Sequence, residues 1–254
     1  MKRVTLTAVP GIPFVQEGDD VASLLLAGLA QAGLSLQDDD VVAVAQKIIS
    51  KAEGRLVNLG DVQPGERAMA VAGETEKDPR LVELILRESE GISRMAPGIL
   101  IVRHRLGFTS ANAGIDRSNV EQTGEDVTVL LLPVDPDASA ARLRQAIDER
   151  TGAAVGVVIV DSHGRPFRLG TVGVAIGAAG LPALWDRRGE EDLYGYHLQH
   201  TEVGLADEIA SAASLLMGQA AESVPAVLVR GLSLPGREGS ARDLVRPKEK
   251  DLYR

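Results

Sequence analysis

The pattern of hydrophobic and polar positions shifts along the chain between the period of a strand and that of a helix. Val4–Val9 alternates loosely until a Pro-Gly pair interrupts it, and Val41–Ala45 is a short apolar run, so both predict strands. Between them, Asp19 or Asp20 suits a helix N-cap, and apolar residues then recur on one face until Gly33. The chain therefore begins as strand, helix and strand.

The same two periods continue through the rest of the chain. A helix is expected from Pro79, because proline is favoured at the first helical position. Further strands are expected over Gly98–Val102, Val127–Leu132, Ala154–Val160, Thr171–Ile176 and Ala226–Val229, and helices over Ala138–Arg150 and Thr201–Ala221. We interpret Pro133–Asp137 as a linker or a turn. The pattern predicts a mixed α and β fold in a single unit over residues 1–254, with or without two subdomains, whose residues 234–254 form a charged, loosely attached extension.

The composition is that of an ordinary globular protein. Of the 254 residues, 44% are hydrophobic, 25% charged and only 3% aromatic, so the core must be built from Val, Leu, Ile and Ala. The absence of cysteine excludes disulfides, thiolate metal sites and a cysteine nucleophile. The net charge of -9 disfavours a general nucleic-acid partner, and no run approaches the roughly 18 apolar residues that span a bilayer. With no signal-peptide pattern at the N-terminus, we expect a cytoplasmic protein that binds neither nucleic acid nor membrane.

Common nucleotide and nucleophile motifs are absent. The chain has no Gly-x-x-x-x-Gly-Lys-Ser/Thr loop, no Gly-x-Gly-x-x-Gly fingerprint and no Gly-x-Ser-x-Gly elbow. The glycine-rich run Gly170–Gly180 has the wrong spacing for a dinucleotide loop, so we interpret it as a strand and turn. His197 and His200 are spaced to share a helix face, but a metal site would need further ligands, and a surface pair is the simpler interpretation.

Three polar segments carry candidate chemistry. Asp161–Arg168 begins with a carboxylate after an apolar strand and continues with a hydroxyl and two arginines, which suit Mg²⁺ or Mn²⁺ and a phosphate or carboxylate group. Gly107–Val120 is rich in small and polar residues, and its Asp116 could join Asp161 in holding a metal that bridges nucleotide phosphates. Ala45–Arg55 places three cations after a strand, where phosphate sites gather in α/β sheets. Taken one by one, a capped polar loop, an irregular turn and a solvated charged face remain open alternatives.

Taken together and in order, these segments resemble the coenzyme F420:L-glutamate ligase family, also called F420-0:gamma-glutamyl ligases. The resemblance runs from about Met1 to Arg230, and its specificity lies in the ordered combination rather than in any single piece. It is carried by Gly11–Phe14 (GIPF), Glu17–Asp20 (EGDD), Ser50–Arg55 (SKAEGR), Ala113–Val120 (AGIDRSNV), Leu132–Ala138 (LPVDPDA), Asp161–Arg168 (DSHGRPFR), Asp207-Glu208 and Leu216–Gln219 (LMGQ).

The resemblance implies a two-lobed α+β fold that is neither P-loop nor Rossmann. It further implies transfer of the γ-phosphoryl group of GTP to the terminal carboxylate of coenzyme F420-0, attack of the L-glutamate amine on that acyl phosphate, and addition of a second, γ-linked glutamate. GDP and phosphate leave. The expected cofactors are two Mg²⁺ or Mn²⁺ ions, with K⁺ as a further candidate, and the expected assembly is a homodimer.

The resemblance also assigns residues by position. Asp116 and Asp161 match ligands of the first metal, while Ser162 and Gln219 match ligands of the second, Gln219 standing where the family commonly has Glu. Positions that match GTP contacts are Gly11, Ile12, Pro13, Phe14, Gln46, Lys51, Asn119, Met217, Gly218, Gln219, Ala220, Ala221, Glu222, Ser223 and Val224. On charge and position alone, we expect Arg165 to be a catalytic clamp on phosphoryl or carboxylate groups.

Three other functions fit the residue types. One is another nucleotide-dependent carboxylate–amine ligase or phosphotransferase, which nucleotide and acceptor screening would separate. Another is a non-catalytic nucleotide-binding module, which predicts GTP binding without turnover. The last is a structural or interaction protein, which predicts no metal-dependent nucleotide binding.

Overall fold

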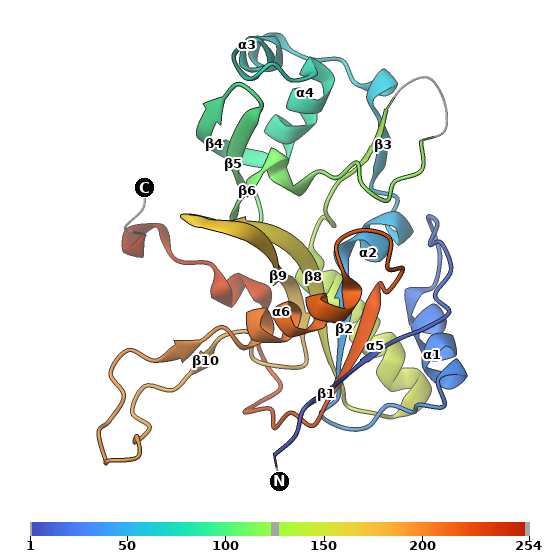
Figure 1. Ribbon diagram of the computed structural model, residues 1–254, viewed down its shortest axis with the longest axis vertical. Helices are drawn as coiled ribbons and strands as arrows, with labels where there is room; N and C mark the ends of the chain where they lie inside the picture. Colours follow the sequence, from blue (N-terminus) through green and yellow to red (C-terminus); the bar gives the residue numbers. More distant parts are fainter. Residues whose placement is uncertain (1, 123–126, 252–254) are drawn as a thin grey trace.

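A five-stranded sheet forms the centre of the larger of two lobes (Figure 1). The computed structural model describes residues 2–122 and 127–251. The strand order is β1-β12-β2-β8-β9, in which β2 and β8 are parallel and the other neighbours are antiparallel. The strands are β1 (Thr5–Ala8), β12 (Ala226–Arg230), β2 (Val41–Ala45), β8 (Gly156–Arg165) and β9 (Arg168–Ala179).

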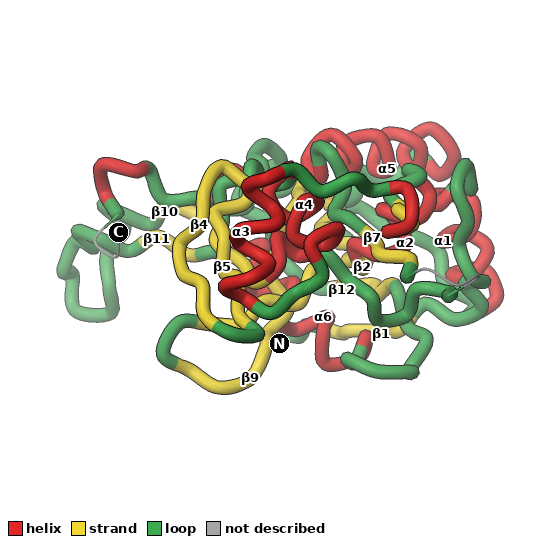
Figure 2. Tube along the Cα trace, turned by 90° about the horizontal axis from the view of Figure 1, so that it is seen from above, coloured by secondary structure: helices red, strands yellow, loops and turns green. Residues whose placement is uncertain are grey.

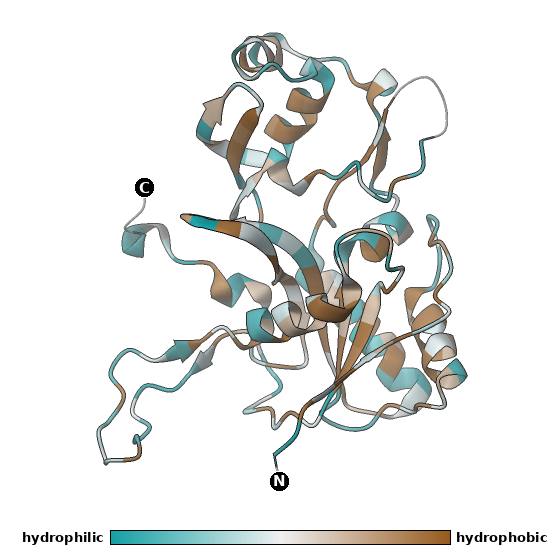
Figure 3. Ribbon diagram, viewed as in Figure 1, coloured by the Kyte–Doolittle hydropathy of each residue, from teal (hydrophilic) through white to brown (hydrophobic). Residues whose placement is uncertain are grey.

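Both faces of this sheet are covered, which explains why β2 is apolar at successive positions. Val42 and Val44 face the helices α1 (Val21–Gln31), α2 (Gln46–Ala52) and α5 (Pro136–Thr151), whereas Val41 and Ala43 face α6 (Leu205–Met217). Figure 2 shows α5 and α6 on opposite sides of the sheet. The hydropathy colours of Figure 3 mark the inner strands of the sheet as its hydrophobic part.

Local signals set the helix ends as the sequence predicted. The Asp20 side chain caps α1 by accepting a hydrogen bond from the Ser23 N–H at 3.2 Å. Helix α4 (Pro79–Arg87) has proline in its first turn. Gly152 ends α5 in the left-handed conformation, at φ 70°.

The smaller lobe is built from the middle of the chain. It combines α3 (Glu66–Thr75) and α4 with a sheet of β4 (Ser89–Ala96), β5 (Ile99–His104) and β6 (Thr109–Ala111). Its core contains Ile85, Leu100 and Val102. A second small sheet pairs β3 with β7, and two 3-10 turns complete the lobe; these elements are β3 (Leu56–Asn58), β7 (Thr128–Leu130), η1 (Leu59–Asp61) and η2 (Asn112–Gly114).

The chain crosses between the lobes twice, and the two crossings are tied together. Leu131 packs in the smaller lobe and Leu132 in the larger, so the return crossing lies between these neighbours. Arg55, on the outward crossing, donates to the Leu132 carbonyl at 2.9 Å and accepts the Leu131 N–H at 3.1 Å. The segment Pro133–Asp137, predicted as a linker or turn, directly follows the return crossing and enters α5.

Three predicted elements have markedly different bounds in the structure, and one of them is β9, which was expected over Thr171–Ile176 but extends from Arg168 to Ala179. The strand expected to end before Asp161 continues to Arg165, because its outer half is hydrogen-bonded to β9 in a long hairpin whose polar side chains reach solvent. The helix expected over Thr201–Ala221 is limited to α6, since Gly204 and Gly218 bound it on either side. The polar residues after Asp161 are typical of a loop, which is why the strand was expected to end there. Small apolar residues around α6 continued the helical pattern past Gly204 and Gly218.

The C-terminal segment, expected to be loosely attached, contacts the larger lobe through Arg237 and Ala241. Arg237 forms an ion pair with Asp39 at 2.6 Å, and the N–H of Ala241 donates to Asp137 at 2.8 Å. Two 3-10 turns follow, η3 (Ala241–Leu244) and η4 (Lys248–Lys250). An arm between β10 (Trp185–Asp186) and β11 (Glu202–Val203) extends away from the body in Figure 1. No helix in the described part of the chain is long and apolar enough to cross a membrane.

Candidate active site between the lobes

The parallel pairing of β2 and β8 brings two of the predicted segments to one edge of the sheet. Ala45, the last residue of β2, pairs with Val160 of β8. Gln46 and Asp161 directly follow these partners, and carboxyl ends of parallel strands are where α/β sheets bind ligands. Gln46 is almost fully buried, at 2% exposure, and its amide oxygen accepts the Ser50 hydroxyl at 2.8 Å.

Asp116 reaches this edge from the smaller lobe. A bridge to Leu130 holds its backbone, with hydrogen bonds in both directions of 2.9 Å and 2.8 Å. Its Oδ2 accepts hydrogen bonds from Lys47 Nζ at 2.6 Å and from Gln46 Nε2 at 3.1 Å. Lys47 also donates to the Ser118 hydroxyl at 3.1 Å. The carboxylate of Asp116 therefore joins the two lobes through the first turn of α2.

Electrostatics at this point favour a bound cation. Burial raises the pKa of Asp116 above its ordinary value, and the nearby charge of Asp161 raises it further, whereas Lys47 acts in the opposite direction. Two carboxylates that repel each other this way each become easier to ionise when a cation lies between them. The structure thus brings together Asp116 and Asp161, the residues predicted as ligands of the first metal.

The oxygen groups predicted to hold divalent metal are divided between the two faces of β8. Residues 2–122 and 127–251 contain no cluster of three Asp, Glu or His that could hold a metal ion by itself. Asp161 and Ser162 are successive strand residues, so their side chains point to opposite faces. Ser162 pairs with Gly173, which packs against α6, and therefore lies on the face of the sheet that α6 covers. Asp116 and Asp161 suit one ion, and Ser162 and Gln219 could serve only a second.

Three segments predicted to contact GTP meet beside this centre. Lys51 donates to the Asn119 carbonyl at 2.8 Å, and the Asn119 side chain donates to the Ala220 carbonyl at 3.0 Å. Asn119 has a left-handed backbone, at φ 55°, which asparagine tolerates better than most residues. Burial lowers the pKa of Lys51, with a further contribution from the charge of Lys47. Asn119 thus links α2 to the loop that follows α6.

The loop after α6 already binds one carboxylate of this chain, that of Glu222. The Glu222 carboxylate accepts the Ala220 N–H at 2.8 Å, and backbone N–H groups of the loop lower the pKa of Glu222 below its ordinary value. Backbone N–H groups that converge on a carboxylate can also bind phosphate. The rest of the predicted segment shares this loop or the end of α6: Met217, Gly218, Gln219, Ala221, Ser223 and Val224.

Two other groups of predicted residues do not contact Asp116 or Lys47 through hydrogen bonds or ion pairs within the described residues. In the described part of the chain, no hydrogen bond or ion pair joins Gly11–Phe14 to Asp116 or Lys47, and the Phe14 side chain is 93% exposed. Arg165 lies at the tip of the β8–β9 hairpin, where its guanidinium donates to the Leu169 carbonyl at 2.9 Å. It lies four residues after Asp161, which corresponds to roughly 13 Å along the strand.

Three residues that the structure places at the site had no predicted role: Lys47, His104 and His163. His163 Nε2 lies 2.9 Å from Asp161 Oδ2 and so fixes that carboxylate. The His163 ring contacts Phe108 at 4.8 Å between centroids, and Phe108 stacks on His104 at 5.0 Å, forming a column into the smaller lobe. The available signals were the cation-rich segment around Lys47 and the i, i+2 spacing of Asp161 and His163.

Comparisons with known proteins agree on one family. A model of the family described as F420-0:Gamma-glutamyl ligase matches residues 11–231. The chain is 46% identical over 253 residues to a coenzyme F420:L-glutamate ligase of Methanothermobacter thermautotrophicus, covering 99% of both chains. It is 48% identical over 244 residues to that of Methanopyrus kandleri, covering 94% of this chain and 93% of the relative. It is 44% identical over 252 residues to that of Archaeoglobus fulgidus, covering 99% of this chain and 97% of the relative.

Proposed function

Since the chain belongs to the F420-0:gamma-glutamyl ligase family, we propose that it uses GTP and divalent metal to join L-glutamate to coenzyme F420-0. The names of its relatives support the ligase activity and its place in F420 biosynthesis. The observation that carries the nucleotide and metal parts is the meeting of Asp116, Lys47 and Asp161 between the lobes. Two carboxylates, an ammonium group and an N–H-rich loop together suit a metal–triphosphate.

The proposed reaction has two steps. A carboxylate oxygen of F420-0 attacks the γ-phosphorus of GTP, the bond to the β-phosphate oxygen breaks, and GDP leaves. The neutral amine of L-glutamate then attacks the acyl carbon, phosphate leaves with the bonding electron pair, and the nitrogen loses a proton to form the amide. A second turnover on the new terminal glutamate would add a γ-linked residue.

Within these steps, the chain acts mainly by positioning and electrostatics. Lys47 and Lys51 lie where they can bind phosphate oxygens, and Asn119 holds the loop after α6 against α2. His163 fixes the orientation of Asp161. Asp116 and Asp161 would hold one metal ion, and Ser162 with Gln219 would contribute to a second. Bound Mg²⁺ or Mn²⁺ would offset the negative charge that the transferring phosphoryl group carries in its transition state.

We further propose that the active form is a homodimer. The arm between β10 and β11 supports this, because its tip exposes 97% of Leu193 and 95% of Tyr194. Exposed apolar side chains on a projecting arm are typical of a contact with another chain. Light scattering after gel filtration would give the mass of the assembly, and K⁺ dependence can be measured in the same preparations.

The test is a product assay. The purified protein is incubated with F420-0, L-glutamate, GTP and Mn²⁺, and products are followed by mass spectrometry, with the Asp161→Asn variant as control. A glutamate-dependent mass gain with GDP release, lost in the variant, would support the proposal. GTP binding without any product would favour a non-catalytic module, and products only with another acceptor or nucleotide would favour a related ligase.

A further inference from the structure

A half-open cavity lies next to the candidate active site, and neither GTP nor metal accounts for it. Its volume is about 300 Å³. Most of its lining comes from three parts of the chain: the β5–β6 turn around Phe108, the β8–β9 hairpin around His163 and Ile176, and the C-terminal segment around Val245. The first turns of α5 and α6 add Asp137 and Asp207. Val245 sits so close to Gly107 that a side chain at position 107 would come within 2.8 Å of it. The C-terminal segment therefore forms one wall of this cavity.

Three carboxylates line the cavity, those of Asp137, Asp207 and Asp251, and the first two differ in what they bind. Asp137 is occupied, since its Oδ1 accepts the N–H groups of Ala178 at 2.9 Å and Ala241 at 2.8 Å, and its Oδ2 lies 3.8 Å from Arg242. Asp207 accepts one N–H, that of Ala175, at 2.8 Å through Oδ1. Its Oδ2 has no hydrogen bond or ion pair among the described residues, and burial raises its pKa. Asp207 therefore offers a ligand one oxygen that the fold does not use.

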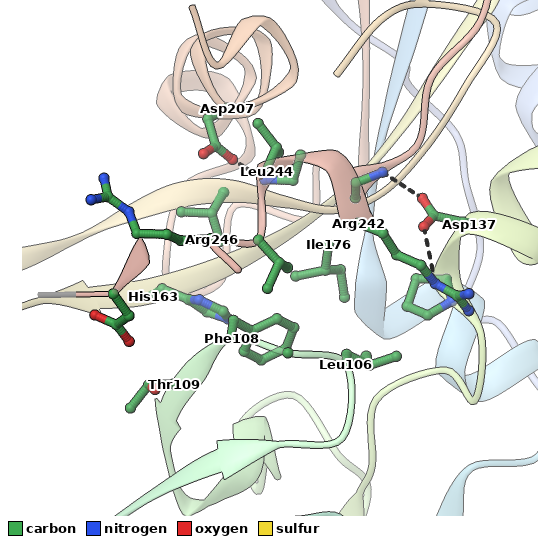
Figure 4. A pocket seen from close by; sticks show the side chains of 17 residues that line it. Leu106, Phe108, Thr109, Asp137, His163, Ile176, Asp207, Arg242, Leu244 and Arg246 are labelled. Atoms are coloured by element: carbon green, nitrogen blue, oxygen red, sulfur yellow. Dashed lines mark hydrogen bonds and ion pairs between the residues drawn. The ribbon is translucent and has the colours of Figure 1, made fainter. Parts of the chain in front are cut away.

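A cation accompanies Asp207 at the same end of the cavity. In the view of Figure 4, Asp207, His163 and Arg246 lie toward one end, and Asp137 with Arg242 toward the other. Arg242 is shared with Asp135, at 3.0 Å. Arg246 makes no ion pair within residues 2–122 and 127–251, so its guanidinium is open to a carboxylate. The free carboxylate oxygen of Asp207 can bind the ammonium group of a free amino acid, and the guanidinium of Arg246 can bind its α-carboxylate.

The cavity also opens toward the reacting groups. His163 lines it and hydrogen-bonds Asp161 at 2.9 Å, so the end with Asp207 and Arg246 is the end nearest the Asp116–Asp161 centre. A volume of about 300 Å³ is at the lower limit for small-molecule sites, which accommodates an amino acid but not a deazaflavin with its ribityl and phospholactyl arm.

We propose that this cavity binds the amino-acid co-substrate, with Asp207 holding its ammonium group and Arg246 its α-carboxylate. The inference rests on the proposed ligase function for the identity of that amino acid as L-glutamate. Arg242, at the far end, is the cation toward which the side-chain carboxylate extends. The amine then lies at the end of the cavity where an acyl phosphate beside Asp161 would meet it.

The test uses two variants and a matched control in the full chain. Asp207→Asn keeps an oxygen for the Ala175 N–H but removes the charge, and should raise KM for L-glutamate by at least about tenfold while KM for GTP stays within about twofold. Arg246→Met should do the same. Glu208→Gln removes the neighbouring, exposed carboxylate of α6 and should leave KM for L-glutamate unchanged. Unfolding in urea establishes that each variant folds.

Glutarate separates the two contacts, because it has both carboxylates of glutamate but no amine. As a competitor of L-glutamate, it should keep its inhibition constant in Asp207→Asn and lose affinity in Arg246→Met. Unchanged KM for L-glutamate in both variants would overturn the inference even if the ligase reaction is established. If the wild type makes no F420 product, calorimetry with L-glutamate decides: binding that Asp207→Asn weakens supports the inference although the proposed function fails, and no binding overturns it.

Discussion

The ammonium group of Lys47 lies 2.6 Å from Oδ2 of Asp116, so that one ion pair connects the larger lobe to the smaller at the candidate active site. Both side chains are about three-quarters buried, at 26% and 29% exposure. Gln46 and Lys51 were the residues of this segment expected at the site, and in the structure Lys47 donates to Asp116 together with Gln46.

Replacing Lys47 by methionine should weaken nucleotide binding without unfolding the protein. The apolar stem is kept, and the lost charge-assisted contact with phosphate should raise KM for GTP by about tenfold or more. Steady-state kinetics with GTP as the varied substrate measures this. Lys77→Met, on the turn between α3 and α4, is the control. Equal KM values in the wild type and Lys47→Met would mean that Lys47 serves only the contact between lobes.

Asp116→Asn should abolish turnover yet leave the metal-free protein at least as stable as the wild type. The raised pKa shows that the ionised carboxylate is unfavourable in the folded state, so removing its charge at neutral pH does not remove a net stabilising group. Thermal unfolding with and without Mn²⁺ checks this. Mn²⁺ should raise the melting temperature of the wild type but not of the variant. An equal rise in both proteins would remove Asp116 from the metal site.

Asn119→Gly should loosen the link between α2 and the loop after α6. Glycine accepts the φ of 55° and keeps the carbonyl that binds Lys51, so only the hydrogen bond to Ala220 is lost. One such bond is worth about 1 kcal/mol, which corresponds to roughly a fivefold weaker affinity for GTP. Calorimetric titration with GTP measures it. Glu76→Gly makes the same backbone change at φ 55° in the smaller lobe and should leave GTP affinity unaltered.

His104 should make the stability of the protein fall in mild acid. The ring is fully buried, and burial lowers its pKa from 6.5 to about 4, against the attraction of Glu88 and together with the repulsion of Arg105, His163 and Arg55. Between pH 6.5 and about pH 4, the His104 ring is protonated in the unfolded chain and neutral in the folded chain. The neutral His104 ring therefore contributes fully to the free energy of unfolding above pH 6.5. This contribution, up to about 3 kcal/mol, is lost as the pH falls toward 4.

Urea unfolding near neutral pH and near pH 5 tests this with the His104→Asn variant. The asparagine oxygen can replace Nδ1 as acceptor of the Leu106 N–H, so the variant loses the titrating ring and keeps that bond. Its stability should depend less on pH than that of the wild type. His200→Asn, which alters an exposed histidine, should retain the wild-type dependence. If the stability of all three proteins falls equally steeply with pH, groups other than His104 cause the pH dependence.

Short-range signals allowed the sequence to determine most of the elements. Asp20 as a cap, Pro79 at a first helical turn and the two-faced apolar run of β2 each specify local structure through the backbone around them. The ordered motifs likewise pointed to the family, since each is read from adjacent residues. What the sequence did not reveal is where a strand stops when its polar half is paired in a hairpin, as at Asp161–Arg165.

Tertiary structure alone decided which of these groups meet. The parallel register of β2 and β8 places Asp161 beside α2, and the double crossing near Arg55 and Leu132 returns Asp116 to the same point. The side chains of Lys47, Asp116 and Asp161 are far apart in sequence, so their mutual distances follow from the packing of two lobes and not from any local preference. The cavity at Asp207 has the same origin, because its walls come from the smaller lobe, the central hairpin, the helices α5 and α6, and the C-terminal segment.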